Sequence, residues 1–466
     1  MEFEQFYLSC LSHASYLIGD QGEAAVIDPQ RDVDLYLEAA RAKGLTSRYV
    51  LETHLHADFV SGHRELAERA GATIVLGARA GAEFPHRAVK DGDQLMVGRV
   101  RITVLETPGH TPEGVSYLVE DGGDPNAAPR LLTGDTLFVG DVGRPDLVTS
   151  KGYTAGDMAG MLYDSLHEKI LPLPDQTTIW PAHGAGSACG KNIGKELHST
   201  LADQRRFNPN LAPMSRAAFI ELVTTDLPPA PEYFGFDAET NRMGAAPLGD
   251  LPEPRPLTPA EVVSAQAAGA IVLDVRDGVE FCAGHTPGAR NIGLAGQFAP
   301  WAGALLPVTA RLVLVADDLD AVRQARLRLA RVGIENVAGY LDGGLAEWAR
   351  AGRPVEAFEN ITVRELAERI ERGAAPVVFD VRGPGEFAEG HVPGAQSRPL
   401  GPRLMVNASE ARAPLAVLCQ GGYRSVIASS LLAATHPGPI WNVLGGTDAW
   451  RGAGLPIETG TPLTAG

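Results

Sequence analysis

The sequence has few cysteines, no long apolar run and no excess of basic residues. Its four cysteines are scattered without a pairing pattern, which favours free thiols in a reducing cytoplasm over a disulfide framework. No apolar run reaches the roughly 18 residues that a membrane-spanning helix needs. The acidic start, MEFEQF, lacks the basic region of a secretory signal. A formal net charge of −17 makes nucleic acid and anionic membranes unfavourable partners. We therefore expect a cytoplasmic protein that acts on small molecules.

The length of the chain and the change in its sequence pattern indicate several domains. At roughly 150 residues per domain, a chain of 466 residues suggests about three domains. Residues 1–226 alternate strand-like apolar runs with helical patterns, and we expect helices over residues 61–70, 158–171 and 191–206. Residues 227–256 are rich in proline, which predicts an extended, semi-rigid linker.

The rest of the chain repeats itself, with one copy over residues 257–356 and a second over residues 357–466. The run IVLDVR at 271–276 recurs as VVFDVR at 377–382. Each copy opens with a threonine that is followed three residues later by a glutamate, which is the capping box of a helix. Because each copy then alternates buried strands with helices, two tandem α/β domains with parallel sheets are predicted.

The two copies differ at a loop that follows a buried strand. In the second copy this loop is CQGGYR, from Cys419 to Arg424. Its glycines allow backbone amides to turn inward, a helix begins there and Arg424 adds a positive charge, so the loop favours a thiolate beside an anionic group. In the first copy the cysteine is lost and Ala321 stands in place of the arginine. We interpret Cys419 and Arg424 as catalytic and the first copy as inactive. The alternative is that Cys419 is a small buried apolar residue.

A set of histidines and aspartates follows strand-like runs in the first 226 residues. His54, His56 and Asp58 alternate in THLHADF, so they would share one face of an extended strand. Imidazole and carboxylate groups are ligands of zinc and ferrous iron. Three more such residues lie in turns after apolar runs: His110, Asp135 and His183. Ordinary core or surface roles would explain one segment but not this recurrence, and a metal site is therefore predicted where the strand ends meet.

Residues 1–226 resemble the metallo-β-lactamase superfamily, whose HxHxDH motif is followed by a distant histidine, an aspartate and a last histidine. The segments TPGHTPEG at 107–114, TGD at 133–135, GRPD at 143–146 and PAH at 181–183 look most like the persulfide dioxygenases of that superfamily. The resemblance implies an αββα sandwich and one Fe(II) per chain, with zinc as the alternative metal. The iron ligands that it implies are His54, His110 and Asp135, and His56 is the alternative to His54.

Two histidines and one carboxylate form a facial triad, which leaves positions open on ferrous iron for oxygen and substrate. The residues left over, His56, Asp58 and His183, would then orient ligands or bound water. The position after Asp58 holds Phe59, where two-metal hydrolases place a histidine, and this favours a single-metal site. His63 lies four residues later, but inside the predicted helix.

Two further residues near these motifs are candidates for binding the substrate. Arg144 would hold an anionic substrate or order the site. Cys189 lies in a loop of small residues shortly after His183. Packing and the transport of a persulfide are both open for Cys189.

Residues 256–460 resemble two rhodanese domains, because the Cys419 loop matches the rhodanese pattern of cysteine, four residues and arginine. The domain order is similar to that of bacterial persulfide dioxygenase–sulfurtransferase fusions used in sulfide detoxification. This resemblance implies oxidation of a low-molecular-weight thiol persulfide by O2 to sulfite and thiol. Cys419 would move sulfane sulfur between persulfide or thiosulfate and sulfite. We also expect a homo-oligomer without nucleic-acid or membrane partners.

Other functions are compatible with parts of the pattern. The first is a zinc-dependent thiolester hydrolase of the glyoxalase II type that carries rhodanese modules. In the second, the C-terminal half is a binding module in which Cys419 is only a surface thiol. A phosphatase is disfavoured because phosphatases with the rhodanese fold use a loop one residue longer. The thiol carrier and the direction of sulfur transfer are left open.

Overall fold

The computed structural model describes residues 1–124, 126–148, 152–373, 376–402, 404, 414–436 and 438–460. By compactness the chain divides into two units. The first comprises Met1–Leu251 with Ala330–Gly333, and the second comprises Pro252–Leu329 with Ile334–Gly466. All four cysteines are free thiols.

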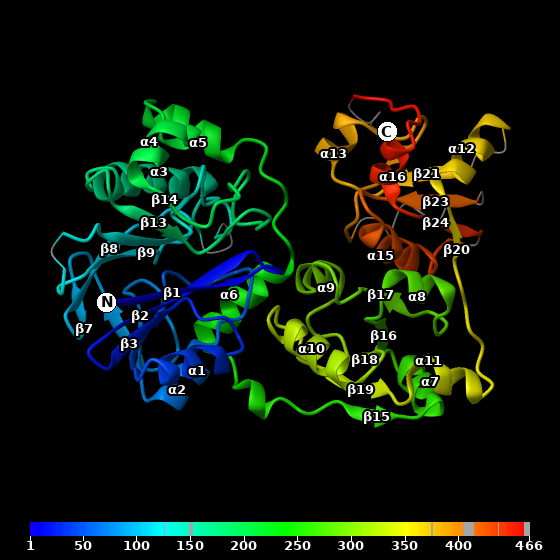
Figure 1. Cartoon of the computed structure of the whole chain (residues 1–466), viewed down its shortest axis with the longest axis horizontal. Helices are drawn as coiled ribbons and strands as arrows, with labels where there is room; N and C mark the ends of the chain where they lie inside the picture. The colour runs from blue at the N-terminus through cyan, green and yellow to red at the C-terminus, as the bar shows by residue number, and fades with distance from the viewer. Residues whose placement is uncertain are drawn as a thin grey trace. The chain divides into compact units, whose positions relative to one another are not determined.

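Two six-stranded sheets form the centre of the first unit (Figure 1). The first sheet contains, in spatial order, β1 (Glu2–Leu8), β2 (His13–Asp20), β3 (Glu23–Ile27), β4 (Thr46–Leu51), β5 (Thr73–Gly77) and β6 (Arg87–Val89). The second contains β14 (Ser199–Thr200), β13 (Thr178–Pro181), β10 (Arg130–Gly134), β9 (Val115–Glu120), β8 (Val100–Glu106) and β7 (Gln94–Val97). A short hairpin of β11 (Leu137–Phe138) and β12 (Asp141–Val142) forms a separate two-stranded sheet.

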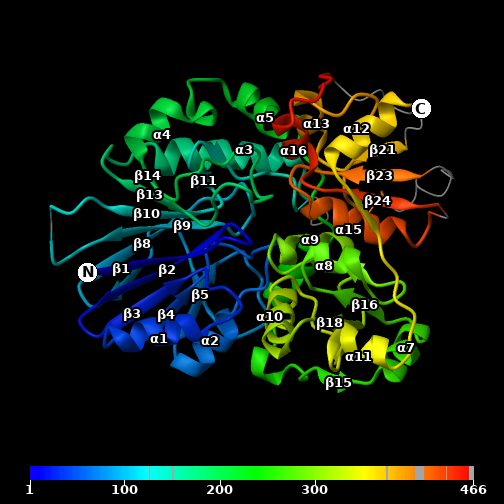
Figure 2. The same ribbon diagram turned by 45° about the vertical axis from the view of Figure 1, so that its right-hand side comes forward.

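Helices cover the outer face of each sheet, as the two views show (Figures 1 and 2). The first sheet is covered by α1 (Asp34–Ala42) and α2 (His63–Ala70). The second is covered by α3 (Ala155–Ser165), which continues into the π-helical turn Leu166–Ile170, and by α4 (Leu201–Phe207) and α5 (Arg216–Thr224). The predicted helix–sheet–sheet–helix sandwich is confirmed.

Apolar side chains on both faces of the strands hold this sandwich together. On β2, Ile18 belongs to the core between the two sheets, whereas Leu17 packs under the helices that cover the first sheet. On β3, Ile27 and Val26 divide in the same way. Because neighbouring side chains of a strand point to opposite faces, a strand buried on both faces reads as a continuous apolar run.

The predicted helix over residues 191–206 is wrong for its first ten residues. The backbone N–H groups of Lys191 and Asn192 donate to the carboxylate of Asp141 over 2.7 and 2.6 Å, which holds this segment as a loop. The helix α4 begins only at Leu201, where the side chain of Thr200 accepts a hydrogen bond from the N–H of Asp203 and caps the first turn.

The prediction of an extended linker over residues 227–256 is wrong for α6 (Tyr233–Met243). Asn241 on this helix is buried and donates two hydrogen bonds of 2.8 Å, to the carbonyl oxygens of His56 and Phe59. The N–H of Ser61 donates to the side-chain oxygen of Asn241 over 2.8 Å. The helix therefore supports the loop that carries the first metal motif. Proline marks the ends of this segment but does not exclude a helix between them.

The second unit contains two five-stranded sheets in which every observed strand pairing is parallel. The first sheet is ordered β15 (Arg255–Leu257), β19 (Val337–Leu341), β18 (Leu312–Val315), β16 (Ile271–Asp274) and β17 (Arg290–Asn291). The second is ordered β20 (Glu359–Ile361), β24 (Ile440–Val443), β23 (Leu415–Leu418), β21 (Val377–Asp380) and β22 (Gln396–Ser397). The identical order confirms the two predicted parallel α/β repeats.

Four helices of the first repeat have counterparts among the described helices of the second. The first repeat has α7 (Pro259–Ala267), α8 (Gly278–Ala283), α9 (Phe298–Leu305), α10 (Leu319–Ala330) and α11 (Gly344–Arg350). The second has α12 (Val363–Glu371), α13 (Pro384–Glu389), α15 (Tyr423–Leu432) and α16 (Gly446–Gly452). Both predicted capping boxes are present, at Thr258 with Glu261 and at Thr362 with Glu365. Within the described ranges, no helix is long and apolar enough to cross a membrane.

Candidate metal centre and sulfur-transfer site

Strand direction brings the predicted metal ligands to one edge of the first unit. In the second sheet β8 and β10 are each antiparallel to β9, so they run in the same direction, and β13 is parallel to β10. His110, Asp135 and His183 therefore follow strand ends at one edge of this sheet. His54, His56 and Asp58 follow β4 of the first sheet in the same way.

His54, His110 and Asp135 form one compact group of buried side chains. The Oδ2 atom of Asp135 lies 3.7 Å from Nε2 of His54 and 3.4 Å from Nε2 of His110. The three ligand atoms all lie within 4.8 Å of one another, a spacing that can hold a metal ion. Each of these atoms is buried and lacks a hydrogen-bond partner. Buried polar atoms without partners are rare in folded proteins, so their convergence fits a bound cation.

Glycines allow the ligand loops to approach this closely. Gly134, directly before Asp135, has a φ of 51°, and a Cβ atom there would lie 2.5 Å from Oγ1 of Thr53. A Cβ atom on Gly143 would lie 1.9 Å from the carbonyl oxygen of Asp135. A larger residue at either position would displace the loops that carry the ligands.

Hydrogen bonds to Nδ1 set the tautomers of the histidines. Nδ1 of His110 donates to the carbonyl oxygen of Arg144 over 2.9 Å, and Nδ1 of His183 donates to that of Ser12 over 3.2 Å. Because a carbonyl only accepts, both Nε2 atoms keep a free lone pair in the neutral ring. Burial lowers the pKa of His110 to about 4 and that of His183 to about 3, which favours the neutral form needed for metal binding.

His56, Asp58 and His183 form a second group of buried side chains with ligand atoms within 4.8 Å of one another. Nε2 of His183 lies 3.4 Å from Oδ2 of Asp58 and 3.6 Å from Oδ1 of Asp135. Asp135 therefore faces His54 and His110 with one oxygen and His183 with the other. The geometry groups His54, and not His56, with His110 and Asp135.

His56 is held from behind by two buried carboxylates that the sequence interpretation missed. Its Nε2 lies 3.2 Å from Oδ1 of Asp28 and 3.1 Å from Oε2 of Glu52. Burial alone would lower the pKa of His56, but these two carboxylates raise it well above its ordinary value. Asp28 and Glu52 each follow a buried strand, β3 and β4, which is the same signal from which the metal ligands were predicted.

Phe59 and His63 both follow the first metal motif, and His63 lies in a helix as predicted. Phe59 is fully buried, and its ring centroid lies 4.4 Å from that of His56 and 4.2 Å from that of His13. His63 begins α2 and its Nδ1 lies 3.3 Å from Oε1 of Glu52, so it supports the carboxylate behind His56. His13, to which the sequence interpretation assigned no role, donates from Nε2 to the carbonyl oxygen of Asp28 over 2.8 Å.

Arg144 orders the loops around the site. Its side chain is buried, and its Nε and Nη2 donate to the carboxylate of Asp146 over 2.7 and 2.8 Å. Its Nη1 and Nη2 also donate to the carbonyl oxygens of Ala188 and Pro228. With these donors engaged inside the protein, the ordering role fits Arg144 better than the binding of an anionic substrate.

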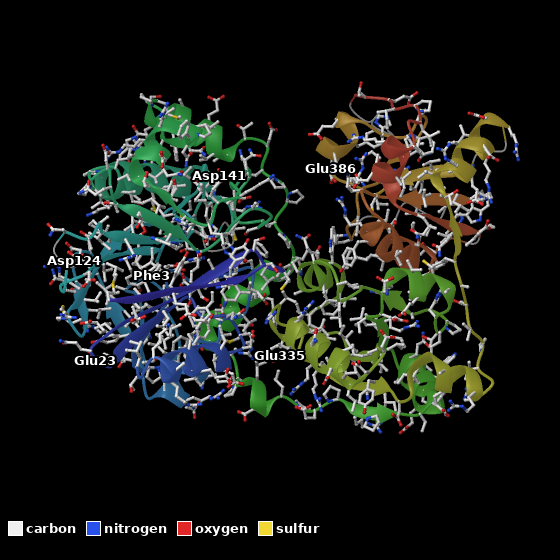
Figure 3. The ribbon with its side chains drawn as sticks, in the orientation of Figure 1. Phe3, Glu23, Asp124, Asp141, Glu335 and Glu386 are labelled. Atoms are coloured by element: carbon white, nitrogen blue, oxygen red, sulfur yellow. The ribbon has the colours of Figure 1, made fainter. Side chains whose placement is uncertain are left out.

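Cys189 lies at the edge of the metal site. Its Sγ, His183 and Asp135 form a further group with ligand atoms within 4.8 Å, and the side chain is fully buried. Burial and the charges of Asp58 and Asp135 raise its pKa well above the ordinary value. The loop that carries it is anchored by Asp141, which is labelled in Figure 3.

The Cys419 loop closes around the sulfur atom as predicted from its glycines. The N–H of Gly422, which has a φ of 113°, donates to Sγ of Cys419 over 3.1 Å. The N–H of Thr447 donates to the carbonyl oxygen of Cys419 over 2.8 Å and fixes the start of the loop. In the first repeat, Asp318 accepts a hydrogen bond of 2.8 Å from the N–H of Ala321 and caps α10 instead.

Arg424 is paired with a residue that the sequence interpretation did not select. Its two Nη atoms each donate to an oxygen of Glu386 on α13 over 2.7 Å. Glu386 is labelled in Figure 3. This bidentate contact lowers the pKa of Glu386 below its ordinary value. The charge of Arg424 thus braces the loop. Glu386 begins the segment EFAEGHVPGA, which occurs in the first repeat as EFCAGHTPGA at residues 280–289.

The fold and the site together define an enzyme of the metallo-β-lactamase fold that is joined to two rhodanese-like domains. A model of the metallo-beta-lactamase superfamily matches residues 8–183, and a model of the rhodanese-like domain matches residues 258–351 and 362–453. A structure described as a metallo-beta-lactamase from Staphylococcus aureus subsp. aureus COL is 35% identical, with a TM-score of 0.65. That similarity covers 73% of this chain and 98% of the other.

Relatives of known name narrow this assignment. The mitochondrial persulfide dioxygenase ETHE1 of Bos taurus is 32% identical over 235 residues, with 49% of this chain and 82% of the relative covered. The corresponding protein of Homo sapiens is 31% identical over 235 residues, with the same coverage. The chain therefore belongs to the persulfide dioxygenase family within the metallo-β-lactamase superfamily, with two rhodanese-like domains after the catalytic sandwich, as the resemblance predicted.

Proposed function

We propose that this chain is a non-haem iron persulfide dioxygenase fused to a sulfurtransferase. Its first unit would oxidise a low-molecular-weight thiol persulfide with O2 to sulfite and free thiol. Its second unit would move sulfane sulfur between persulfide or thiosulfate and sulfite through Cys419. The observation that carries the proposal is the convergence of buried, unpartnered ligand atoms from His54, His110 and Asp135.

The donor set fits a single ferrous ion. His54, His110 and Asp135 would hold it, since two imidazoles and one carboxylate form the facial arrangement that non-haem Fe(II) oxygenases use. Ferrous iron in such a site supplies the redox chemistry that couples dioxygen to the oxidation of sulfur. Phe59 offers no ligand at the position where two-metal relatives would need one, and this supports the stoichiometry of one metal per chain.

The remaining residues of the site would position the reactants. His183 and Asp58 lie on the far side of Asp135, where they would orient substrate or bound water. Asn241 and Glu52 support the loop that carries His54 from behind. Cys189 lies with Asp135 and His183 at the edge of the metal site. Its thiol would either carry a persulfide there or, as its full burial suits, only pack.

Sulfur transfer at Cys419 needs no external oxidant or reductant. The thiolate of Cys419 attacks the terminal sulfur of a persulfide RSSH, so that a Sγ–S bond forms and the RS–S bond breaks. The leaving RS⁻ takes the electron pair, and the cysteine becomes a persulfide. Sulfite then attacks this outer sulfur, which releases thiosulfate and restores the Cys419 thiolate. The reverse direction uses the same bonds.

The partners proposed for the chain are small molecules, namely a persulfide, O2, sulfite and thiosulfate. Net negative charge argues against nucleic acid and anionic membranes as partners. A cytoplasmic location, a homo-oligomeric state and the domain boundaries at residues 226, 256 and 356 remain predictions from the sequence.

A metal-resolved assay tests this function. Protein reconstituted with Fe(II) without oxygen should contain about one iron per chain. In an oxygen electrode it should consume O2 when given the persulfide of glutathione, coenzyme A or cysteine, and sulfite or the thiosulfate that Cys419 forms from it should accumulate. Zinc-loaded protein is the matched control and should consume none, because zinc has no redox chemistry.

One observation favours the alternative of a zinc-dependent thiolester hydrolase of the glyoxalase II type. The group of His56, Asp58 and His183 could hold a second metal next to the first. A hydrolase would bind about two zinc ions per chain and cleave a glutathione thiolester. Metal analysis combined with a thiolester assay separates the two functions.

A further inference from the structure

A cavity of about 460 Å³ lies beside Cys419, and residues of both repeats line it. Cys419, Tyr423 and Arg424 belong to the active loop of the second repeat. Gln297 and Trp301 come from the first repeat, at the start of α9 and within it. The first repeat, which has no cysteine at the position equivalent to Cys419, therefore supplies one wall of the pocket beside Cys419.

Contacts between the repeats fix that wall against the active loop. The hydroxyl of Tyr423 donates to the carbonyl oxygen of Gly293 over 2.8 Å. A Cβ atom on Gly296 would lie only 2.4 Å from the Tyr423 ring, so glycine allows the ring to pack against the segment before α9. The N–H of Asn291 also donates to Oγ of Ser430 on α15 over 3.0 Å. These contacts make the position of α9 relative to Cys419 part of the folded structure.

The chemistry of the wall suits an organic group better than an inorganic anion. Trp301 is partly exposed, and Gln297 is exposed. Both Nη atoms of Arg424 are engaged by Glu386, so the guanidinium charge that would attract thiosulfate is already paired. The cavity volume lies within the roughly 300–1,000 Å³ of sites for small organic ligands. An aromatic ring and an amide side chain can pack against and hydrogen-bond a peptide-like or nucleotide-like group.

We propose that Trp301 and Gln297 of the inactive repeat bind the carrier part of an organic thiol whose sulfur is exchanged at Cys419. The partner class is then an organic persulfide, RSSH, with its terminal sulfur at Cys419 and R against Trp301. This inference rests on the sulfur transfer proposed for Cys419. The bond changes are those of that transfer: the Sγ–S bond forms, the RS–S bond breaks and RS⁻ leaves along the wall.

The test compares organic and inorganic sulfur donors on the full chain. Glutathione persulfide and coenzyme A persulfide are organic donors that distinguish the two carriers, and thiosulfate with cyanide as acceptor is the inorganic donor. Trp301→Ala should raise KM for an organic persulfide roughly ten-fold, the effect of removing an aromatic anchor, and leave kcat unchanged. Thiosulfate kinetics should not change. Trp301→Phe should recover most of the KM, and Leu319→Ala, at an exposed apolar residue of the same repeat, should resemble the wild type.

Two outcomes would overturn the inference. If Trp301→Ala weakens transfer from thiosulfate and from the persulfides equally, the tryptophan only supports the fold. If it changes neither, the wall does not bind the carrier. Gln297→Ala, at an exposed position, provides a second test of the same wall if the tryptophan variant folds poorly. Failure of the underlying function would look different, because the wild type itself would then transfer no sulfur from any donor.

Discussion

Oγ1 of Thr53 lies 2.9 Å from Nδ1 of His54 and 2.9 Å from Oδ2 of Asp28. A carboxylate only accepts, so the single hydroxyl proton of Thr53 is donated to Asp28. The hydroxyl oxygen must then accept the Nδ1–H of His54. This relay fixes the His54 tautomer with its lone pair on Nε2, the atom that faces Asp135.

Removing the relay should weaken metal binding. Thr53→Val keeps the shape of the side chain but cannot accept from His54, so the ring loses its fixed tautomer and orientation. We expect iron affinity to fall about ten- to hundred-fold, the usual effect of losing such a supporting contact. Competition with a chelator measures the affinity directly. Thr46→Val, at an exposed residue of β4, the strand that precedes Thr53, is the matched control and should bind iron like the wild type.

Phe59 offers a test of the single-metal prediction. Phe59→His would place an imidazole next to His56, which forms a group with Asp58 and His183, and the metal content should rise from about one towards about two ions per chain. Phe59→Leu, which removes the ring without adding a ligand, should stay at about one. The number of metal ions per chain is measured after dialysis against zinc. A content of one in both variants would mean that Phe59 is not what limits the site to one metal.

The group of candidate metal ligands could be predicted because its residues share a local signal. Each follows an apolar strand and lies in a turn, and parallel strand direction then brings His54, His110, Asp135 and His183 together. The parallel sheets of the repeats were predictable for the same reason, since their buried strands are short apolar runs that alternate with capped helices.

Other parts of the site depend on contacts between segments far apart in the sequence. Asn241 reaches the metal-motif loop from a segment whose prolines suggested extended chain. Glu52 and Asp28 are single acidic residues after strands, and only the fold shows that both face His56. The pairing of Arg424 was not predicted because its partner, Glu386, lies 38 residues earlier in the chain.

The pair of Glu386 and Arg424 predicts a pH dependence. Contact with Arg424 lowers the folded-state pKa of Glu386, so the stabilisation is fully present above its ordinary pKa and is lost as pH falls through the folded value. Because Glu386 is partly exposed, the effect is modest: Glu386→Gln should lower Tm at neutral pH by about 2 °C. The difference from the wild type should shrink in acid. Thermal unfolding of both proteins across pH checks this, and an equal difference at every pH would contradict it.

Cys419 separates the two proposed activities. Cys419→Ser removes the sulfur nucleophile but leaves the first unit untouched, so thiosulfate–cyanide sulfur transfer should fall to background. Oxygen consumption with a persulfide should stay within about two-fold of the wild type, since the two sites share no residue. Unchanged sulfur transfer would mean that Cys419 is a surface thiol in a binding module. Cys282→Ser, at the buried cysteine of the inactive repeat, is the control and should keep both activities.

Oxygen uptake tests most directly whether the first unit is an iron-dependent persulfide dioxygenase. Iron-loaded wild type and His110→Ala are each given glutathione persulfide. We expect the wild type to form sulfite and thiosulfate in a combined amount equal to the oxygen consumed, because Cys419 converts sulfite to thiosulfate, whereas His110→Ala should hold little iron and consume almost no oxygen. Wild-type protein that carries its full iron and takes up no oxygen with any small persulfide would contradict it.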